Sequence, residues 1–286
     1  MEIIRRPHLM QQTALDLKRD RLKIAFVPTM GALHAGHLSL VRRANQMGQV
    51  TVVSIFVNPT QFGPSEDFEQ YPRDLGRDVD QLKELDVDYV FAPDPADMFP
   101  GGSGTYLYNE TMSNRFCGKS RPGHFRGVLT VVAKLFNLVR PDFAVFGQKD
   151  FQQAALIKRM VLDLNFLTEI VLCPTVRESD GLALSSRNIF LKPEERQAAL
   201  VLHRALRGAE AMVADGEDDT EKLAEAMRET ISGGPLVRLD YAEVADAATL
   251  EPLERLDRRA VALVAAGVGV TRLIDNTLLE PPEEKQ

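Results

Sequence analysis

The sequence predicts a doubly wound α/β fold, in which helices cover both faces of a parallel β-sheet, followed by a smaller α+β domain. Three observations support this prediction. Apolar strand-like runs recur in the first part of the chain, amphipathic helical patterns separate them, and this rhythm changes after about residue 176. Alternating strands and helices are typical of a parallel sheet, because each connection must cross a face of the sheet. We therefore expect one domain over residues 1 to 176 and a second over residues 177 to 286.

The strands of the first domain are predicted from continuous apolar runs, which suit strands buried on both faces. The runs are KIAFV (23 to 27), TVVSIFV (51 to 57), DYVFA (88 to 92), FAVFG (143 to 147) and TEIVLC (168 to 173). The helices between them are predicted from apolar residues at helical spacing. They cover residues 37 to 44, 73 to 85, 129 to 139 and 151 to 164. This pattern predicts a Rossmann-like sheet that binds its ligands at the carboxyl ends of the strands.

The second domain is predicted from two helical patterns followed by two strand patterns. The helices cover residues 192 to 216 and 221 to 231, and the strands cover residues 239 to 246 and 259 to 267. Pro193 lies in the expected first turn of its helix, where a missing backbone N–H is tolerated. Residues 177 to 190 are the expected connection between the domains, and residues 281 to 286 are expected to fray.

Composition and charge argue against several classes of protein. Hydrophobic residues make up 44% of the 286 residues, which is enough for a substantial core. The net charge of -7 argues against general affinity for nucleic acid. No run approaches the ~18 apolar residues that a membrane helix needs. Cys117 and Cys173 lack metal-site spacing, and the N-terminus lacks an apolar secretory core, so we expect a reduced cytoplasmic environment.

The segment PTMGALHAGHLSL, residues 28 to 40, places two histidines between a predicted strand and a predicted helix. The first backbone N–H groups of a helix have no partner within it, and its dipole attracts anions to that end. His34 and His37 are three residues apart, so both rings can meet one phosphate. The alternative is a polar turn whose histidines only cap the helix.

Two more segments follow strands of the predicted sheet. NPTQF, 58 to 62, brings the neutral amides of Asn58 and Gln61, which can bind a hydroxyl or carboxylate without adding charge. GQKD, 147 to 150, brings Lys149 as a movable cation and Asp150 as a partner for a helix N-terminus. Each segment has a simpler interpretation, an ordinary turn for the first and a capping acid beside a surface lysine for the second.

Two segments outside the strand ends also carry candidate ligand-binding groups. LSSRN, 184 to 188, offers hydroxyls, a guanidinium and an amide that can hold a second part of a phosphate chain. RFCGKSRPGHFRG, 115 to 127, is expected to be a basic loop suited to a polyphosphate or carboxylate ligand. A serine-rich turn and a solvated charged loop are the alternatives. No GxSxG, Walker lysine or GxGxxG motif is present, which disfavours hydrolase, P-loop and dehydrogenase functions.

The order and spacing of several motifs resemble the pantothenate synthetase (pantoate–β-alanine ligase) family. The motifs are PTMGALHAGH, SIFVNPTQF, YPRD, RPGHFRGV, FGQKDFQQ and DGLALSSRN, and RLIDN resembles the family's carboxyl-terminal domain. HxGH alone indicates only the wider group of nucleotidyl transferases and class I aminoacyl-tRNA synthetases. The resemblance implies a Rossmann-like ligase that condenses pantoate with β-alanine, consuming ATP and releasing AMP and pyrophosphate through a pantoyl adenylate.

The resemblance also implies roles for individual residues. His34 and His37 meet the ATP phosphates, with His37 as proton donor, and Lys149 lies near the transferring phosphate. The other nucleotide-binding positions are Met30, Gly36, Gly147, Asp150, Val176, Ser185, Ser186 and Arg187. Pantoate is held by Met30, Asn58, Gln61 and Gln153.

Further expectations concern the metal ion, the oligomer and the protection of the intermediate. Mg²⁺ is expected to arrive with ATP, held by phosphate oxygens and water rather than by a protein metal site. The family suggests a homodimer. Residues 60 to 71 are expected to form a mobile cover, and the second domain to close over the site, because an acyl adenylate must be kept from water. Gln148 and Ala35 stand where many members carry an acid, which changes local charge but no assigned role.

Two other functions stay open at this point. One is an ATP-binding sensor that keeps the pocket without the chemistry, and the other is adenylyl transfer to a different small acceptor. The presence of His34, His37 and Lys149 favours an enzyme over a sensor.

Overall fold

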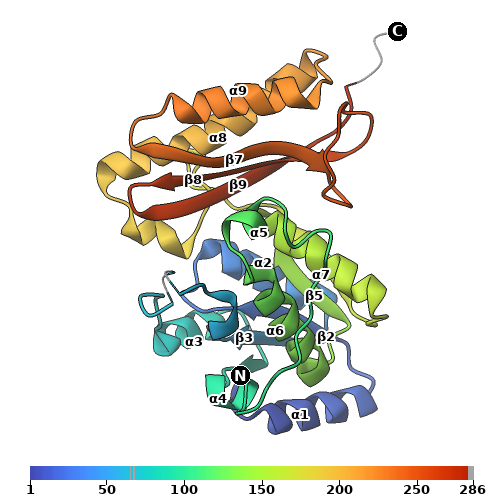
Figure 1. The fold of residues 1–286 in the computed structure, drawn as a ribbon. Coiled ribbons are helices and arrows are strands. Elements are labelled where there is room, and N and C mark those ends of the chain that lie inside the picture. The colour runs from blue at the N-terminus through green and yellow to red at the C-terminus, as the bar shows by residue number, and fades with distance from the viewer. Residues whose placement is uncertain (65, 67, 283–286) are drawn as a thin grey trace. The chain divides into compact units, whose positions relative to one another are not determined.

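The computed structural model describes residues 1–64, 66 and 68–282. The chain divides into two compact units, each with its own sheet (Figure 1). The first unit comprises Met1–Asn114, Arg121–Gln148 and Leu156–Pro174, and the second comprises Arg115–Ser120, Lys149–Ala155 and Thr175–Gln286. Two short segments from the first part of the sequence therefore belong to the second unit. Residues 283 to 286, part of the segment expected to fray, lie outside the described residues.

The first unit is built on a parallel sheet of six strands, as the apolar runs predict. The strands are β1 (Glu2–Ile4), β2 (Ile24–Thr29), β3 (Val50–Ile55), β4 (Tyr89–Phe91), β5 (Phe143–Gly147) and β6 (Glu169–Cys173). Their order across the sheet is β1-β4-β3-β2-β5-β6. The chain runs from β2 outward to β4 and then returns to form β5 on the other side of β2. The strand order thus reverses between β2 and β5, which is where open α/β sheets bind ligands.

Helices cover both faces of this sheet. They are α1 (Pro7–Arg19), α2 (Ala35–Met47), α3 (Leu75–Lys83), α4 (Pro95–Met98), α6 (His124–Val139) and α7 (Phe151–Asp163). On one face, Val27 of β2 shares a buried cluster with Val41 of α2 and Leu82 of α3. On the other face, the ring of Phe26 meets that of Phe136 of α6, with centroids 6.4 Å apart. Adjacent strand residues point to opposite faces, so β2 is buried on both sides.

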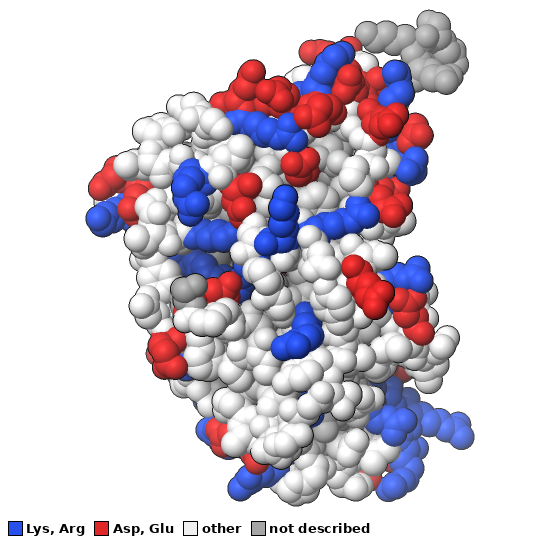
Figure 2. Space-filling view, viewed as in Figure 1, with Lys and Arg blue, Asp and Glu red and all other residues white. Residues whose placement is uncertain are grey.

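The second unit contains an antiparallel sheet of three strands, β7 (Val237–Asp246), β8 (Ala260–Val268) and β9 (Thr271–Leu279), in the order β7-β8-β9. Helices α8 (Pro193–Ala214) and α9 (Thr220–Ser232) pack against it, and α5 (Cys117–Ser120) belongs to the same unit. Pro193 is the first residue of α8, as predicted. On the visible face of this unit, acidic and basic side chains are mixed (Figure 2), and Arg228 pairs with both Glu221 and Glu243.

The predicted elements include no counterpart of β1, α1 and β9, nor of the short helices α4 and α5. β1 is too short for a pattern to emerge, since it spans three residues. α1 buries only Met10 and Ala14 and leaves Leu9 half exposed, so its apolar stripe is narrow. β9 is interrupted by the buried polar pair Asp275 and Asn276. Within the described residues, no helix is both long and apolar enough to cross a membrane.

Candidate active site

Two histidines lie close together where the loop after β2 enters α2. His34 is the N-cap residue of α2, and its ring centroid lies 4.1 Å from that of His37. The Nδ1 of His34 accepts a hydrogen bond from the Gly36 N–H at 3.2 Å, and the Nδ1 of His37 accepts from the His34 N–H at 3.4 Å. An Nδ1 that accepts carries no proton, so the neutral rings hold their proton on Nε2. Both rings therefore cap the helix and also supply N–H donors at an end that attracts anions.

A buried carboxylate that the sequence analysis missed holds this loop in shape. Asp78 of α3 is 2% exposed and accepts hydrogen bonds from the backbone N–H groups of Ala32 at 2.9 Å and Leu33 at 2.8 Å. Burial raises the pKa of Asp78, while these two hydrogen bonds oppose the shift. Gly31 and Ala32 have φ values of 83° and 51°, a left-handed region that disfavours side chains unless the surroundings hold the backbone. Asp78 supplies that restraint.

The sequence contained a signal for Asp78. It follows Leu75 by three residues and precedes Leu82 by four, so it lies on the apolar face of its helix. An acid on a buried helical face must find hydrogen-bond partners, and loop N–H groups are suitable donors. The sequence could not identify which loop would supply them.

The segment after β3 brings three predicted pantoate-binding residues together. Asn58 donates from Nδ2 to the Oε1 of Gln61 at 3.0 Å and to the backbone oxygen of Gly127 at 3.1 Å. Gln61 ends the short 3-10 helix η1 (Pro59–Gln61) and donates from Nε2 to the Sδ of Met30 at 3.2 Å. Asn58 and Gln61 are buried, at 1% and 8% exposure. The three side chains form one polar cluster where β2 and β3 end.

A cavity of about 200 Å³ opens beside this cluster in the first unit. Its lining includes Met30, Gly31, Ile55, Arg73 and Asp78. Of the predicted pantoate-binding residues, only Met30 lines it.

Gly127 of α6 marks the closest approach of that helix to η1. A Cβ at this position would lie 2.3 Å from the backbone oxygen of Thr60 and 2.6 Å from the backbone nitrogen of Gln61. Backbone atoms cannot rotate away as a side chain can, so either η1 or α6 would have to move.

We expect Gly127→Ala to destabilise the protein by about 1–3 kcal/mol, the usual cost of overpacking a core. The free energy of unfolding in urea measures this effect. Gly208→Ala is the matched control, because Gly208 lies in helix α8 and a Cβ there would meet nothing within 4 Å. The control should be neutral or stabilising, since alanine favours a helix. Equal stability of the Gly127 variant would contradict the described packing.

The basic segment 115 to 127 is not the open loop that was expected. Residues Cys117–Ser120 form α5, and α6 begins at His124. Arg121 makes a bidentate ion pair with Glu66, at 2.6 Å for both contacts, and His124 Nδ1 lies 2.8 Å from the backbone oxygen of Gln61. The alternative of a solvated charged loop does not hold for Arg121 and His124, because the ion pair with Glu66 and the contact with the Gln61 backbone satisfy these two side chains. The ion pair instead braces the segment that carries Gln61.

The pKa of Glu66 provides a pH test of this brace. Burial raises that pKa, but the hydrogen bond and charge of Arg121, the Gly63 N–H and the charge of His124 together hold it below the ordinary 4.5. A depressed carboxyl pKa stabilises the fold above the unfolded-state pKa and loses this contribution as pH falls through the folded-state pKa. Glu66→Gln should therefore lower the melting temperature at pH 7, and the difference from the parent protein should shrink toward pH 3. A constant difference would show that packing, not charge, is responsible.

The expected cover over residues 60 to 71 can be described only in part. Residues 65 and 67 lie outside the described residues. Gln61 and Tyr71 at the two ends are buried, at 8% and 5% exposure.

The end of β5 leads directly from the first unit into the second. Gly147 ends β5, and the 3-10 helix η2 (Gln148–Asp150) precedes α7. The backbone oxygen of Lys149 accepts a hydrogen bond from Asn276 Nδ2 at 2.9 Å. Within the described residues, no ion pair of the Lys149 side chain is found. Lys149 is thus fixed through its backbone while its amine stays available for an anion.

The other predicted phosphate-binding residues lie in a hairpin of the second unit. The Leu184 N–H donates to the Val176 oxygen at 3.0 Å, which brings the hairpin ends together. Ser185 is the N-cap residue of the 3-10 helix η3 (Ser186–Phe190), and its hydroxyl accepts a hydrogen bond from the Arg187 N–H at 3.2 Å. The candidate residues fall into one group in each unit. The first holds Met30, His34, Gly36, His37, Asn58, Gln61 and Gly147, and the second holds Lys149, Asp150, Gln153, Val176, Ser185, Ser186 and Arg187.

Across residues 1–64, 66 and 68–282, no group of three or more His, Cys, Asp or Glu side chains is arranged to hold a metal ion.

Comparisons with known proteins place these residues in a family context. The model of the family described as pantoate-beta-alanine ligase matches residues 2–278. A curated pantothenate synthetase of Thermotoga petrophila is 53% identical over 279 residues, which is 98% of this chain and 100% of the relative. The solved pantothenate synthetase of Thermus thermophilus is 44% identical, with a TM-score of 0.93 over 98% of this chain and 100% of that chain.

A further solved structure carries ligands. The pantoate-beta-alanine ligase of Francisella tularensis, complexed with Beta-gamma ATP and Beta-alanine, is 38% identical to this chain. Its TM-score is 0.79, and the match covers 97% of both chains.

Proposed function

The chain belongs to the pantoate–β-alanine ligase family, and we propose that it works in two steps, through a pantoyl adenylate. It is a pantothenate-forming ligase that joins pantoate to β-alanine. ATP is its co-substrate, which the ligands of the Francisella tularensis structure support. In the first step the pantoate carboxylate attacks the α-phosphorus of ATP, and pyrophosphate leaves. In the second step the amine of β-alanine attacks the adenylate carbonyl, and AMP leaves.

Two observations carry the proposal: the fixed histidine pair at the start of α2 and the buried amide cluster where β2 and β3 end. Hydrogen bonds to both Nδ1 atoms favour Nε2–H donors on His34 and His37 at the start of α2. These donors suit the charge that develops on the departing pyrophosphate, and His37 is the proton donor. Lys149 adds a cation near the transferring phosphate. Preorganised donors cost no reorganisation during the reaction, so alignment and charge stabilisation are sufficient for this step.

Pantoate is held by Met30, Asn58, Gln61 and Gln153. Its carboxylate is already a nucleophile, so no activated serine or cysteine is required. Asn58 and Gln61 are buried and hydrogen-bonded to each other, which fixes the direction of their amides. Neutral amides bind a hydroxy acid without neutralising the attacking carboxylate.

A further set of residues holds the nucleotide. The nucleoside and phosphates are contacted by Gly36, Gly147, Asp150 and Val176. The phosphate chain is bound by Ser185, Ser186 and Arg187. Mg²⁺ accompanies ATP and shields the phosphate charge, with phosphate oxygens and water as its ligands.

Residues 1 to 176 form the catalytic domain, and residues 177 to 286 close over the site to protect the adenylate from water. The enzyme works as a homodimer in the cytoplasm. The free thiols of Cys117 and Cys173 suit a reducing compartment.

Exchange of labelled pyrophosphate into ATP tests the proposed function. Exchange should require an acid, and pantoate should support it better than other small hydroxy acids. Exchange with another acid but not with pantoate would favour adenylyl transfer to a different acceptor. ATP binding without any exchange or turnover would favour the sensor.

A further inference from the structure

The strand β9 of the second unit contains two adjacent polar residues that are almost fully buried. Asp275 is 4% exposed and Asn276 is 2% exposed. Buried polar groups lower stability unless they are hydrogen-bonded. The hydrogen-bond partners of Asp275 and Asn276 therefore indicate the role of these two residues. The partners of this pair lie in the two segments that carry the proposed phosphate-binding residues of the unit.

Asp275 is bonded to the hairpin that leads to Ser185. It accepts two hydrogen bonds from Arg177, at 2.6 and 2.9 Å, in a bidentate ion pair. Arg177 also donates to the backbone oxygen of Gly181 at 3.1 Å and forms a β-bridge with Ala183. The ion pair therefore anchors both arms of the hairpin to β9.

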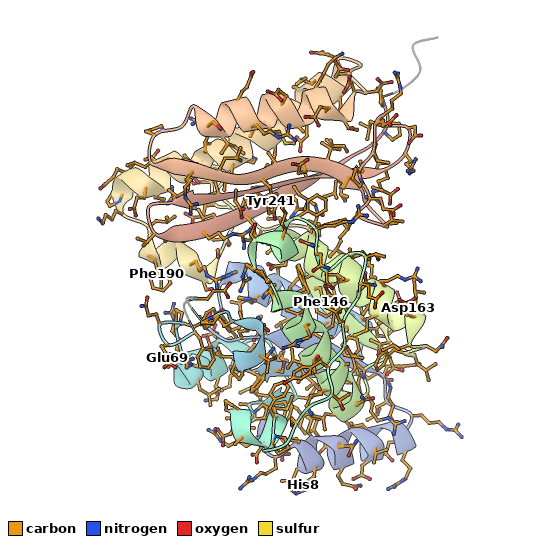
Figure 3. The ribbon with its side chains drawn as sticks, viewed as in Figure 1. His8, Glu69, Phe146, Asp163, Phe190 and Tyr241 are labelled. Atoms are coloured by element: carbon orange, nitrogen blue, oxygen red, sulfur yellow. The ribbon has the colours of Figure 1, made fainter. Side chains whose placement is uncertain are left out.

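The turn of this hairpin is restrained as well. Gly181 has a φ of 98°, and a Cβ there would lie 2.1 Å from the His203 ring. The turn thus packs directly against α8. The hairpin leads into η3, which ends at the labelled Phe190 (Figure 3).

Asn276 is bonded to the other phosphate-binding segment. Its backbone N–H donates to Asp275 at 2.8 Å, and its Nδ2 donates to the backbone oxygen of Lys149 at 2.9 Å. A small cavity of about 10 Å³ is lined by Lys149 and Ser185 together with Asp275. The two phosphate-binding segments therefore meet at one point on β9.

We propose that Asn276, supported by the Asp275–Arg177 ion pair, is a positioning residue that holds Lys149 in register with the Ser185–Arg187 segment. The proposal rests on the proposed function of Lys149. A lysine side chain has four rotatable bonds, so its amine is positioned only if its backbone is fixed. A misplacement of about 1 Å can slow a reaction by about 10²-fold. The hydrogen bond from Asn276 to the Lys149 backbone can prevent such a misplacement of the lysine.

A double-mutant cycle tests the proposal in the full-length protein. Asn276→Ala should slow pyrophosphate exchange by about 10-fold or more, while the affinity for pantoate stays unchanged. Thr277→Ala is the matched control on the same strand, because its hydroxyl donates to Glu210 rather than toward Lys149. In the Lys149→Ala background, Asn276→Ala should cause no further loss, because Asn276 acts through Lys149. An equal additional loss in both backgrounds would overturn the proposal.

A measurement independent of activity separates this proposal from the proposed function. Asn276→Ala should accelerate hydrogen exchange at residues 149 to 152 relative to Thr277→Ala, and unchanged exchange would overturn the positioning role. Asn276→Asp, which has the same shape but no donor at that position, should accelerate exchange similarly. If Lys149→Ala alone retains normal speed, the proposed role of Lys149 fails, and hydrogen exchange still decides whether Asn276 fixes its backbone.

Discussion

Lys149→Ala is expected to slow formation of the adenylate by about 10²-fold or more, equivalent to about 3 kcal/mol of transition-state stabilisation. The reason is that the departing pyrophosphate gains charge, and Lys149 is a cation whose backbone is fixed by Asn276. Pyrophosphate exchange with saturating pantoate measures the effect on the first step. The affinity for pantoate should change little, because the lysine contributes mainly in the transition state.

Lys158→Ala is the matched control for this prediction. Lys158 is an exposed lysine in α7, so its removal deletes the same charge away from the phosphate site. Circular dichroism should show that both variants are folded. If the Lys149 variant formed adenylate as fast as the Lys158 variant, the assignment of Lys149 to the phosphate site would be wrong.

His37→Ala is expected to have a comparable effect on the same step, about 10²-fold. The hydrogen bond from the His34 N–H to His37 Nδ1 favours a proton on Nε2, so the substitution removes a preorganised donor. It also removes the partner that the ring of His34 stacks against, at 4.1 Å. Single-turnover measurements of adenylate formation separate this loss from any change in the second step.

His8→Ala serves as the control for the histidine. His8 lies on the exposed side of α1 and is labelled in Figure 3. Its removal should leave adenylate formation unchanged. A His37 variant that keeps its fold and its normal rate would show that the histidine pair only caps the helix.

The α/β sheet could be predicted because its signals are local. β2 and β5 are apolar runs whose central residues are buried, and helices on both faces of β2 explain why its residues do not alternate between apolar and polar. The position of His34 and His37 at the start of α2 also followed from local order, since a strand, a turn and a helix succeed one another within a short stretch of chain. The apolar runs and the strand–turn–helix order involve residues that are close together in the sequence, so the sequence alone is sufficient to recognise them.

The restraints on the site could not be predicted in full, because they join residues far apart in the sequence. Asp78 reaches the loop at Ala32, and Asn276 reaches Lys149 from a distant part of the chain. The sequence predicted a basic loop at residues 115 to 127. In the structure, Arg121 of this segment pairs with Glu66, and His124 contacts the backbone of Gln61. A sequence shows that such side chains are polar and sometimes that they are buried, but not which backbone they contact.

The position of ¹⁸O after one reaction tests the two-step mechanism most directly. Pantoate labelled with ¹⁸O in its carboxylate is incubated with ATP, β-alanine and the enzyme, and the products are examined by mass spectrometry. Attack of the carboxylate on the α-phosphorus makes a new oxygen–phosphorus bond, which stays with AMP when the amine displaces it. The account therefore predicts one labelled oxygen in AMP and none in pyrophosphate. Label in pyrophosphate or free phosphate would contradict attack at the α-phosphorus and with it the proposed mechanism.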